Sequence, residues 1–150
     1  MKLTSPDFSE GSNIPERFTC DGHDISPALN IEEVPPAAKS LVLIVDDPDA
    51  PVGTFTHWLI WNLRPDLSEM MADSSPPGAV QGVNDFGTRG YGGPCPPSGV
   101  HRYYFKLYAL DTTLELTPQS RRKAVAAAIK GRVIAEATLM GRYAKKGGKR

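Results

Sequence analysis

Apolar residues along this chain occur mostly in short runs with the continuity or the alternation of β-strands. Residues 40–46 form an aliphatic run that ends in acidic residues, which predicts a strand buried on both faces at the centre of a sheet. Segments 54–62 and 101–110 are rich in aromatic and β-branched residues and predict two further long strands. Turn-forming residues separate the other apolar runs, so the pattern indicates a mainly β protein.

The last third of the chain carries the one helical pattern. Thr117 followed by Pro118 is typical of a helix N-cap with proline at the first helical position, and residues 120–130 supply helix formers up to Gly131. Residues 133–143 place apolar side chains on one face at a period of two, which favours a closing strand. Many short strands with one short helix in 150 residues predict a single domain, a two-sheet β-sandwich with an appended helix.

Glycine and proline contribute 14 residues each, well above the usual share. They concentrate in segment 87–99, which holds five glycines and three prolines. Such a segment cannot form regular structure and predicts an irregular loop that presents many backbone groups near the surface. Loops of this kind commonly serve a binding or catalytic function.

Charge and hydropathy exclude several classes of protein. Basic and acidic residues number 17 each, so no net field favours nucleic acid or an anionic membrane. No apolar run approaches the roughly 18 residues of a membrane span, and the first residues lack a secretory signal, so we expect a cytoplasmic protein. Cys20 and Cys95 are therefore expected to be free thiols. A basic tail at residues 145–150 is expected to be frayed, with Lys145, Lys146, Lys149 and Arg150.

The aliphatic strand runs directly into a cluster of carboxylates. Asp46, Asp47 and Asp49 stand within four positions and repel one another. Backbone N–H groups, nearby histidine or arginine side chains, or a ligand must offset that repulsion. The alternative is an ordinary Asp-Pro turn in which each carboxylate accepts backbone hydrogen bonds.

Two histidines stand on predicted strands with aromatic neighbours, His57 and His101. A carboxylate can orient an imidazole so that its second nitrogen faces a cavity, and loop N–H groups can add donors. This combination suits a small anion such as phosphate, which should bind more tightly when histidine is protonated. Asp47 and Asp49 could instead chelate a metal with the histidines, but that spacing is unspecific and we predict neither metal nor cofactor.

Nucleophilic catalysis has weak support in the sequence. Cys95 is the only strong candidate nucleophile, and the chain lacks a G-x-S-x-G elbow, a P-loop and a dinucleotide-binding fingerprint.

Three sequence motifs, in the order in which they occur along the chain, resemble those of a known family. They are DPDAP at residues 47–51, FTHW at residues 55–58 and GPCPPSGVHRY at residues 93–103. The chain resembles the phosphatidylethanolamine-binding protein (PEBP) family, and more narrowly its bacterial and archaeal Raf kinase inhibitor-like branch. Further matching segments between Leu3 and Tyr143 are residues 18–22, 26–27, 84–85 and 135–137.

This resemblance implies a two-sheet β-sandwich with an anion-binding pocket at one end. It also implies protein partners such as a kinase or a protease, while a homodimer stays open. Two prolines within four residues must turn the strand sharply, so we expect a cis bond at Asp47–Pro48 or Ala50–Pro51, the latter favoured because the resemblance places it in the pocket wall. The implied pocket residues are Asp47, Asp49, Ala50, Pro51, His57, Gly93, Pro96, Pro97, His101 and Tyr103.

Three hypotheses about function follow. The leading one is a non-catalytic protein that binds a small phosphate-like or other anionic ligand and thereby regulates a protein partner. The second is a hydrolase or lyase acting on a phosphate ester, with His57 and His101 as acid and base. The third makes the motifs determinants of the fold alone.

Overall fold

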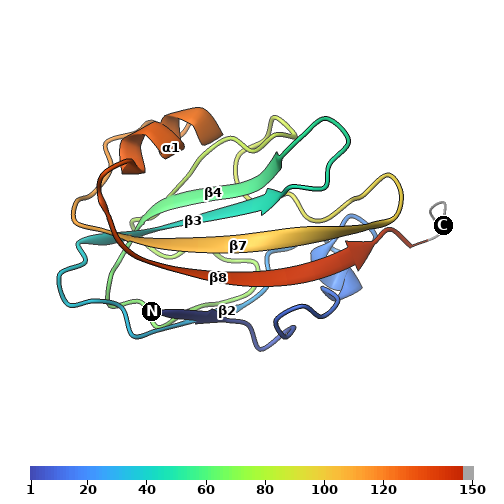
Figure 1. Ribbon diagram of the computed structural model, residues 1–150, viewed down its shortest axis with the longest axis horizontal. Coiled ribbons are helices and arrows are strands. Elements are labelled where there is room, and N and C mark those ends of the chain that lie inside the picture. Colours follow the sequence, from blue (N-terminus) through green and yellow to red (C-terminus); the bar gives the residue numbers. More distant parts are fainter. Residues whose placement is uncertain (147–150) are drawn as a thin grey trace.

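The computed structural model describes residues 1–146 and contains two β-sheets, as predicted (Figure 1). One sheet has three strands in the order β1-β2-β5, and the other has five in the order β6-β4-β3-β7-β8. Within the described residues, no helix has the length and apolarity to cross a membrane. The elements are β1 (Lys2–Thr4), the 3-10 helix η1 (Glu16–Phe18), β2 (Leu29–Glu32), β3 (Ser40–Asp47), β4 (Phe55–Leu63), β5 (Glu69–Met70), β6 (Val80–Gln81), β7 (Val100–Leu110), α1 (Arg122–Ile129) and β8 (Val133–Ala144).

Strand β3 lies at the centre of the five-stranded sheet, which confirms the prediction from its aliphatic run. Every residue of β3 is buried, and the strand pairs antiparallel with β4 on one side and β7 on the other. Val45 faces Trp58 in β4 and Phe105 in β7. The three strands that the sequence predicted with the strongest pattern thus form the middle of the sheet.

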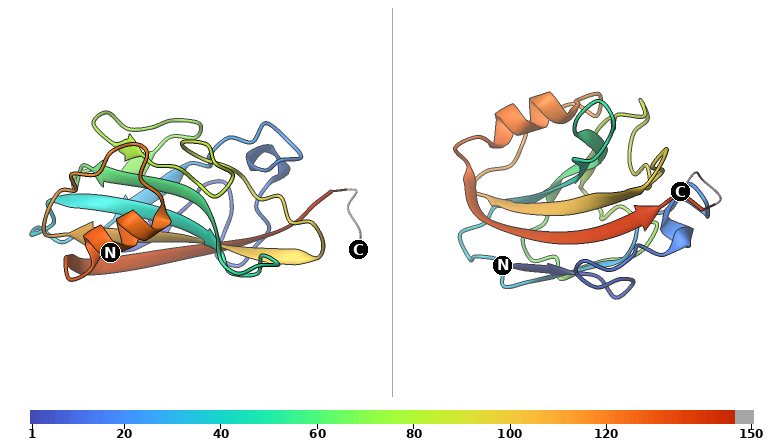
Figure 2. Two further views of the ribbon diagram at one scale, coloured as in Figure 1. Left: turned by 90° about the horizontal axis from the view of Figure 1, so that it is seen from above. Right: turned by 45° about the vertical axis from the view of Figure 1, so that its right-hand side comes forward.

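The five-stranded sheet buries apolar side chains on both faces. One face packs against the three-stranded sheet and the other against α1, so three layers follow one another (Figures 1 and 2). Leu43 and Ile60 point into the first core, while Val42 and Leu59 point into the second. Neighbouring residues of one strand face opposite layers because strand side chains alternate.

The closing strand is confirmed, and the predicted start of the helix is wrong. Strand β8 pairs with β7 along its whole length, with Leu139 buried on the face toward the three-stranded sheet. Helix α1 begins at Arg122. The N-cap residue is Arg121, whose side chain makes no capping hydrogen bond. Thr117 instead opens a turn, because its carbonyl accepts the N–H of Ser120 at 3.0 Å.

The basic tail is described only in part. Lys149 and Arg150 lie outside the described residues. Lys146 is held by two contacts, an ion pair of 3.2 Å with Glu16 and a backbone hydrogen bond of 2.8 Å to Asp21. Fraying of the tail at residues 145–150 stays a prediction.

Candidate functional site

The turn after β3 and the loop before β7 emerge at the end of the sandwich away from α1 (Figure 1). A cavity of about 370 Å³ opens there. Its lining includes every pocket residue that the sequence predicted except Asp49 and Gly93. Its lining residues are Asp47, Ala50, Pro51, Val52, Phe55, His57, Phe86, Cys95, Pro96, Pro97, His101 and Tyr103.

His101 and Asp47 form a buried pair in the lining of the cavity. Nδ1 of His101 lies 2.6 Å from Oδ2 of Asp47, and the two side chains are 9% and 4% exposed. The pair forms because β3 and β7 are neighbours in the sheet and both residues reach the same end. Since the carboxylate accepts the proton of Nδ1, Nε2 of His101 is left for a molecule in the cavity.

His57 is oriented in the same way, by a backbone carbonyl. Its Nδ1 lies 2.7 Å from the carbonyl oxygen of Gly92, an acceptor, so Nδ1 carries a proton and Nε2 is left for a ligand. Aromatic rings enclose the imidazole, with ring-centre distances of 5.0 Å to Phe55, 5.3 Å to Phe86 and 5.2 Å to Tyr103. Burial among these rings lowers the pKa of His57, so the unliganded ring is neutral at pH 7.

Tyr103 brings an unsatisfied hydroxyl to the cavity. The side chain is 1% exposed, and its hydroxyl has no hydrogen-bond partner within residues 1–146. Burial, with the nearby charge of Asp47, raises the pKa of Tyr103 against the opposing effect of the Cys95 backbone N–H, so the group stays protonated and can donate. A buried polar atom without a partner is rare in native proteins, and a ligand in the cavity would provide one.

The carboxylates of the turn diverge and take different partners. Asp49 does not line the cavity: it makes hydrogen bonds of 2.8 and 2.9 Å with the Arg102 guanidinium, which lowers the pKa of Asp49 to about 2. Asp46 points to the opposite face of the sheet from Asp47, where it contacts Thr56, Lys106 and Arg122.

The electrostatics of Asp46 follow from this environment. Burial raises the pKa of Asp46, but the hydrogen bonds and positive charge of Arg122, with Thr56 and Lys106, outweigh it and leave the pKa below its ordinary value. The alternation of side chains along β3 therefore separates charges that the sequence places next to one another, and only Asp47 remains to face an anion.

The expected cis proline is wrong. No peptide bond within residues 1–146 is cis, so both Asp47–Pro48 and Ala50–Pro51 are trans. Hydrogen bonds bend the chain instead: Oδ1 of Asp47 accepts the N–H of Asp49 at 2.8 Å, and the N–H of Gly53 donates to Ala50 at 3.2 Å. Gly53 has a φ of 112°, a backbone conformation that residues other than glycine rarely adopt.

The expectation of free thiols is also wrong. Cys20 and Cys95 form a disulfide with a Cα–Cα distance of 5.4 Å. The loop that carries Cys95 lies against the segment that carries Cys20, and the N–H of Cys20 donates to the carbonyl of Pro94 at 3.1 Å. The compartment argument for thiols could not anticipate this proximity, which arises from residues 75 positions apart.

Four cavity residues were not in the predicted set: Val52, Phe55, Phe86 and Cys95. Phe55 could have been found, since it stands two positions before His57 on the same strand and therefore on the same face. Val52 and Cys95 lie inside or beside motifs that already pointed to the pocket. Phe86 has no local signal, because a separate loop brings it to the cavity.

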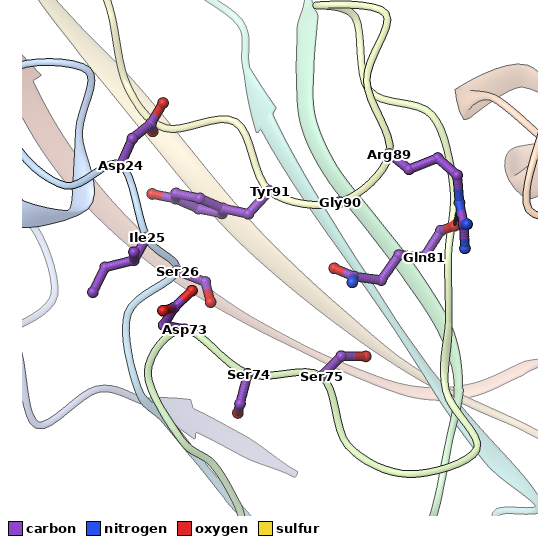
Figure 3. Close-up of a pocket in the computed structure, with 10 residues that line it drawn as sticks. All are labelled: Asp24, Ile25, Ser26, Asp73, Ser74, Ser75, Gln81, Arg89, Gly90 and Tyr91. Carbon is purple, nitrogen blue, oxygen red and sulfur yellow. Dashed lines mark hydrogen bonds between the residues drawn. The ribbon is translucent and has the colours of Figure 1, made fainter.

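A second cavity, of about 240 Å³, is lined mainly by polar side chains (Figure 3). Several of these groups already have partners within the protein. Oε1 of Gln81 accepts a hydrogen bond of 2.8 Å from Trp58, Nε of Arg89 donates to the carbonyl of Gln81, and the Tyr91 hydroxyl donates to Phe18. These groups stabilise the surrounding loops, so the cavity at His57 and His101 is the stronger candidate site.

Gly93 positions the cavity loop without lining the cavity. Its N–H donates to Oδ1 of Asp24 at 2.7 Å, and a Cβ here would overlap that carboxylate and the carbonyl oxygen of Phe18. We expect Gly93→Ala to lower the unfolding free energy by about 1–3 kcal/mol, because the backbone must shift to admit the methyl group.

Chemical denaturation measures this effect. Ser98→Ala is the matched control in the same loop, since Ser98 is exposed and should tolerate the change. Equal stability of Gly93→Ala and the unmodified protein would contradict the close approach.

Comparison with known proteins agrees with this architecture. The family model for phosphatidylethanolamine-binding protein matches residues 4–144. The UPF0098 protein of Methanothermobacter thermautotrophicus is 53% identical over 148 residues, covering 95% of this chain and 98% of that protein. The UPF0098 protein of Aquifex aeolicus is 47% identical over 150 residues, covering 95% of this chain and 88% of that protein.

Solved structures show the same fold. A phosphatidylethanolamine-binding protein homologue from Chlamydia trachomatis, CT736, superimposes with a TM-score of 0.93 at 45% identity, covering 97% of both chains. Escherichia coli YbcL, described as a member of the mammalian PEBP family, gives a TM-score of 0.91 at 33% identity and covers 97% of this chain and 98% of its own. On the extent of these matches, the chain belongs to the phosphatidylethanolamine-binding protein family.

Proposed function

We propose that this protein binds a small phosphate-like anion in the cavity at His57 and His101, without chemical turnover. The observation that carries the proposal is the orientation of the two imidazoles, each tied through Nδ1 so that Nε2 is left for a ligand. The unsatisfied Tyr103 hydroxyl is a donor, and each Nε2 becomes one when its imidazole takes up a second proton. Membership in a family of binding proteins supports the same class of function.

The rest of the cavity favours a ligand with an apolar part. Phe55, Phe86, Pro51 and Pro97 stand around the polar groups and offer no charge to a ligand. A phosphate monoester with a small apolar substituent would place its phosphoryl group at the histidines and its substituent against these side chains.

Hydrolysis of a phosphate ester is the competing hypothesis, with the histidines as acid and base. The environment of the cavity gives it little support. Cys95 is oxidised in the disulfide and offers no thiolate, and the described residues that line the cavity include no serine or threonine. An enzyme here would have to activate water with His57 or His101.

Regulation of a protein partner is a second candidate function. Val52 is 96% exposed and Phe86 is 48% exposed, and both belong to the cavity wall. A partner that presents a phosphorylated side chain to the histidines would also cover these apolar groups. A kinase or a protease is a partner of the kind that the family resemblance suggests.

Calorimetric titration with inorganic phosphate and with phenyl phosphate tests the proposal. We expect saturable one-to-one binding of both, with the phenyl ester favoured by the apolar wall. Native mass spectrometry of protein purified without added phosphate should retain a small anion. Absence of binding would contradict the proposal, and turnover of a panel of phosphate esters would establish the enzyme instead.

Anion binding should strengthen as the pH falls. The pKa of free His57 lies below its ordinary value of 6.5, so the ring must take up a proton to donate from Nε2 to an anion. The charged groups that act on it are Asp47 and, more weakly, Asp46, and the ring of His101 lines the same cavity. Because the ligand favours the protonated ring, binding and proton uptake are linked, and affinity rises on acidification until the pH falls below the pKa of the free ring.

Sulfate is the suitable probe for this effect, because its charge does not change between about pH 5 and 8, whereas phosphate titrates in that range. Affinity should increase over this range toward acid pH, with proton uptake visible as a buffer-dependent binding enthalpy. His57→Gln should flatten the rise. Without ligand the linkage has the opposite effect, since a lowered His57 pKa costs stability as the pH falls. Equal affinity at acid and alkaline pH would contradict the role of His57.

A further inference from the structure

The disulfide stands in the wall of the proposed anion cavity. Cys95 lines that cavity, and Cys95 and Cys20 both line a neighbouring cavity of about 270 Å³. Phe86 is the other residue that both cavities share. The covalent link between segments far apart in the sequence is therefore adjacent to the groups that would hold a ligand.

Three further attachments of this loop precede Cys95, and on the other side the chain is next held at Val100, where β7 pairs with β8. The Tyr91 hydroxyl donates to Phe18 at 2.7 Å, the Gly93 N–H donates to Asp24 at 2.7 Å, and the Pro94 carbonyl accepts from Cys20 at 3.1 Å. The residues that follow, Pro96 and Pro97, line the cavity and have no N–H group to donate. Cys95 is thus the anchor nearest to this part of the cavity wall.

The disulfide is also within reach of a reductant. Cys20 and Cys95 are both partly buried rather than fully enclosed. One thiolate of a small dithiol can attack a sulfur of the disulfide to form a mixed disulfide, and the second thiolate then releases it. Cys20 and Cys95 gain two electrons and two protons and become thiols, while the dithiol is oxidised to a cyclic disulfide.

We propose that the Cys20–Cys95 disulfide is a reversible redox control of the anion cavity, with the oxidised protein binding the anion more tightly than the reduced protein. This inference rests on the proposed function and concerns its regulation. Reduction leaves the hydrogen bonds of Tyr91, Gly93 and Pro94 in place, so the sandwich persists. The cavity wall at Pro96 and Pro97 becomes more flexible, and anion binding must then restrict its conformations.

The ordering cost sets the size of the effect. Restricting a few loop residues on binding costs enough free energy to weaken affinity by roughly fivefold to tenfold. Thermodynamic reciprocity requires the same factor in the other direction, so a bound anion must protect the disulfide against reduction.

Two measurements test the inference with inorganic phosphate as the probe. The first is titration of oxidised and dithiol-reduced protein at a temperature where circular dichroism shows both to be folded. Oxidised protein should bind roughly fivefold to tenfold more tightly, and reoxidation should restore the affinity. The variant Cys20→Ser/Cys95→Ser should bind like reduced protein and ignore the dithiol.

The second measurement remains valid where the reduced protein unfolds. The fraction of protein that carries the disulfide is followed in dithiol buffers of varied reduction potential, with and without saturating phosphate. Phosphate should shift the midpoint toward more reducing buffer, whereas His101→Ala should abolish the shift.

The outcomes separate the two proposals. Equal affinity of folded oxidised and reduced protein overturns redox control and leaves the proposed function standing, and so does an unshifted midpoint when the oxidised protein binds phosphate. Failure of the oxidised protein to bind any phosphate compound contradicts the proposed function itself.

Discussion

Replacement of His101 by alanine is expected to weaken binding of inorganic phosphate by about tenfold to a hundredfold, and His57→Ala should act in the same sense. A hydrogen bond between a charged donor and an anion contributes about 1.5–3 kcal/mol, which corresponds to this range. The effect of His101→Ala should be the larger, because it also leaves the buried carboxylate of Asp47 without its partner and facing the anion.

Titration calorimetry at constant pH measures both losses, and circular dichroism with thermal unfolding shows whether the fold persists. His23→Ala is the matched control, since His23 is exposed and outside the cavity lining, so it should keep full affinity. Full affinity in both cavity variants would refute the assignment of the anion site to this cavity. Anion binding elsewhere on the protein would not change that conclusion.

Loss of the disulfide is expected to lower the unfolding free energy by about 2–4 kcal/mol. The link closes a loop of 75 residues, for which the chain-entropy model gives about 4 kcal/mol at the upper end. The loss should lower the unfolding midpoint by about 2–4 °C for each kcal/mol in a protein of this size.

Differential scanning calorimetry of Cys20→Ser/Cys95→Ser, beside the oxidised and dithiol-treated protein, gives this quantity. The double variant and the reduced protein should unfold at similar temperatures, both below the oxidised protein. Similar midpoints for all three would mean that the link does not restrict the unfolded chain in solution. A stability change alone leaves redox control undecided, because that inference depends on affinity in the folded states.

Sequence alone predicted the four long strands of the five-stranded sheet. Strands β3, β4, β7 and β8 follow from continuous or alternating apolar residues, a signal that each segment carries by itself. The start of α1 was misjudged because the Thr117–Pro118 signature also suits the turn that the protein forms there.

The members of the cavity were also largely predictable, since they occupy three local motifs. What local patterns could not supply is the direction and the partner of each side chain. The neighbours Asp46 and Asp47 serve opposite faces of one sheet, and Asp49 turns to Arg102 instead of the cavity.

The disulfide, the aromatic enclosure of His57 and the contribution of Phe86 were decided by the tertiary structure. Each depends on segments that are distant in the sequence, such as Cys20 beside Cys95 and Phe86 beside His57. Residue periodicity reports which face of its own element a side chain occupies, whereas proximity between elements depends on how the sheets and loops pack. For this reason the sequence determined the strands and most of the residues of the site. The fold decided the burial that lowers the pKa of His57 and the pairing of Cys20 with Cys95.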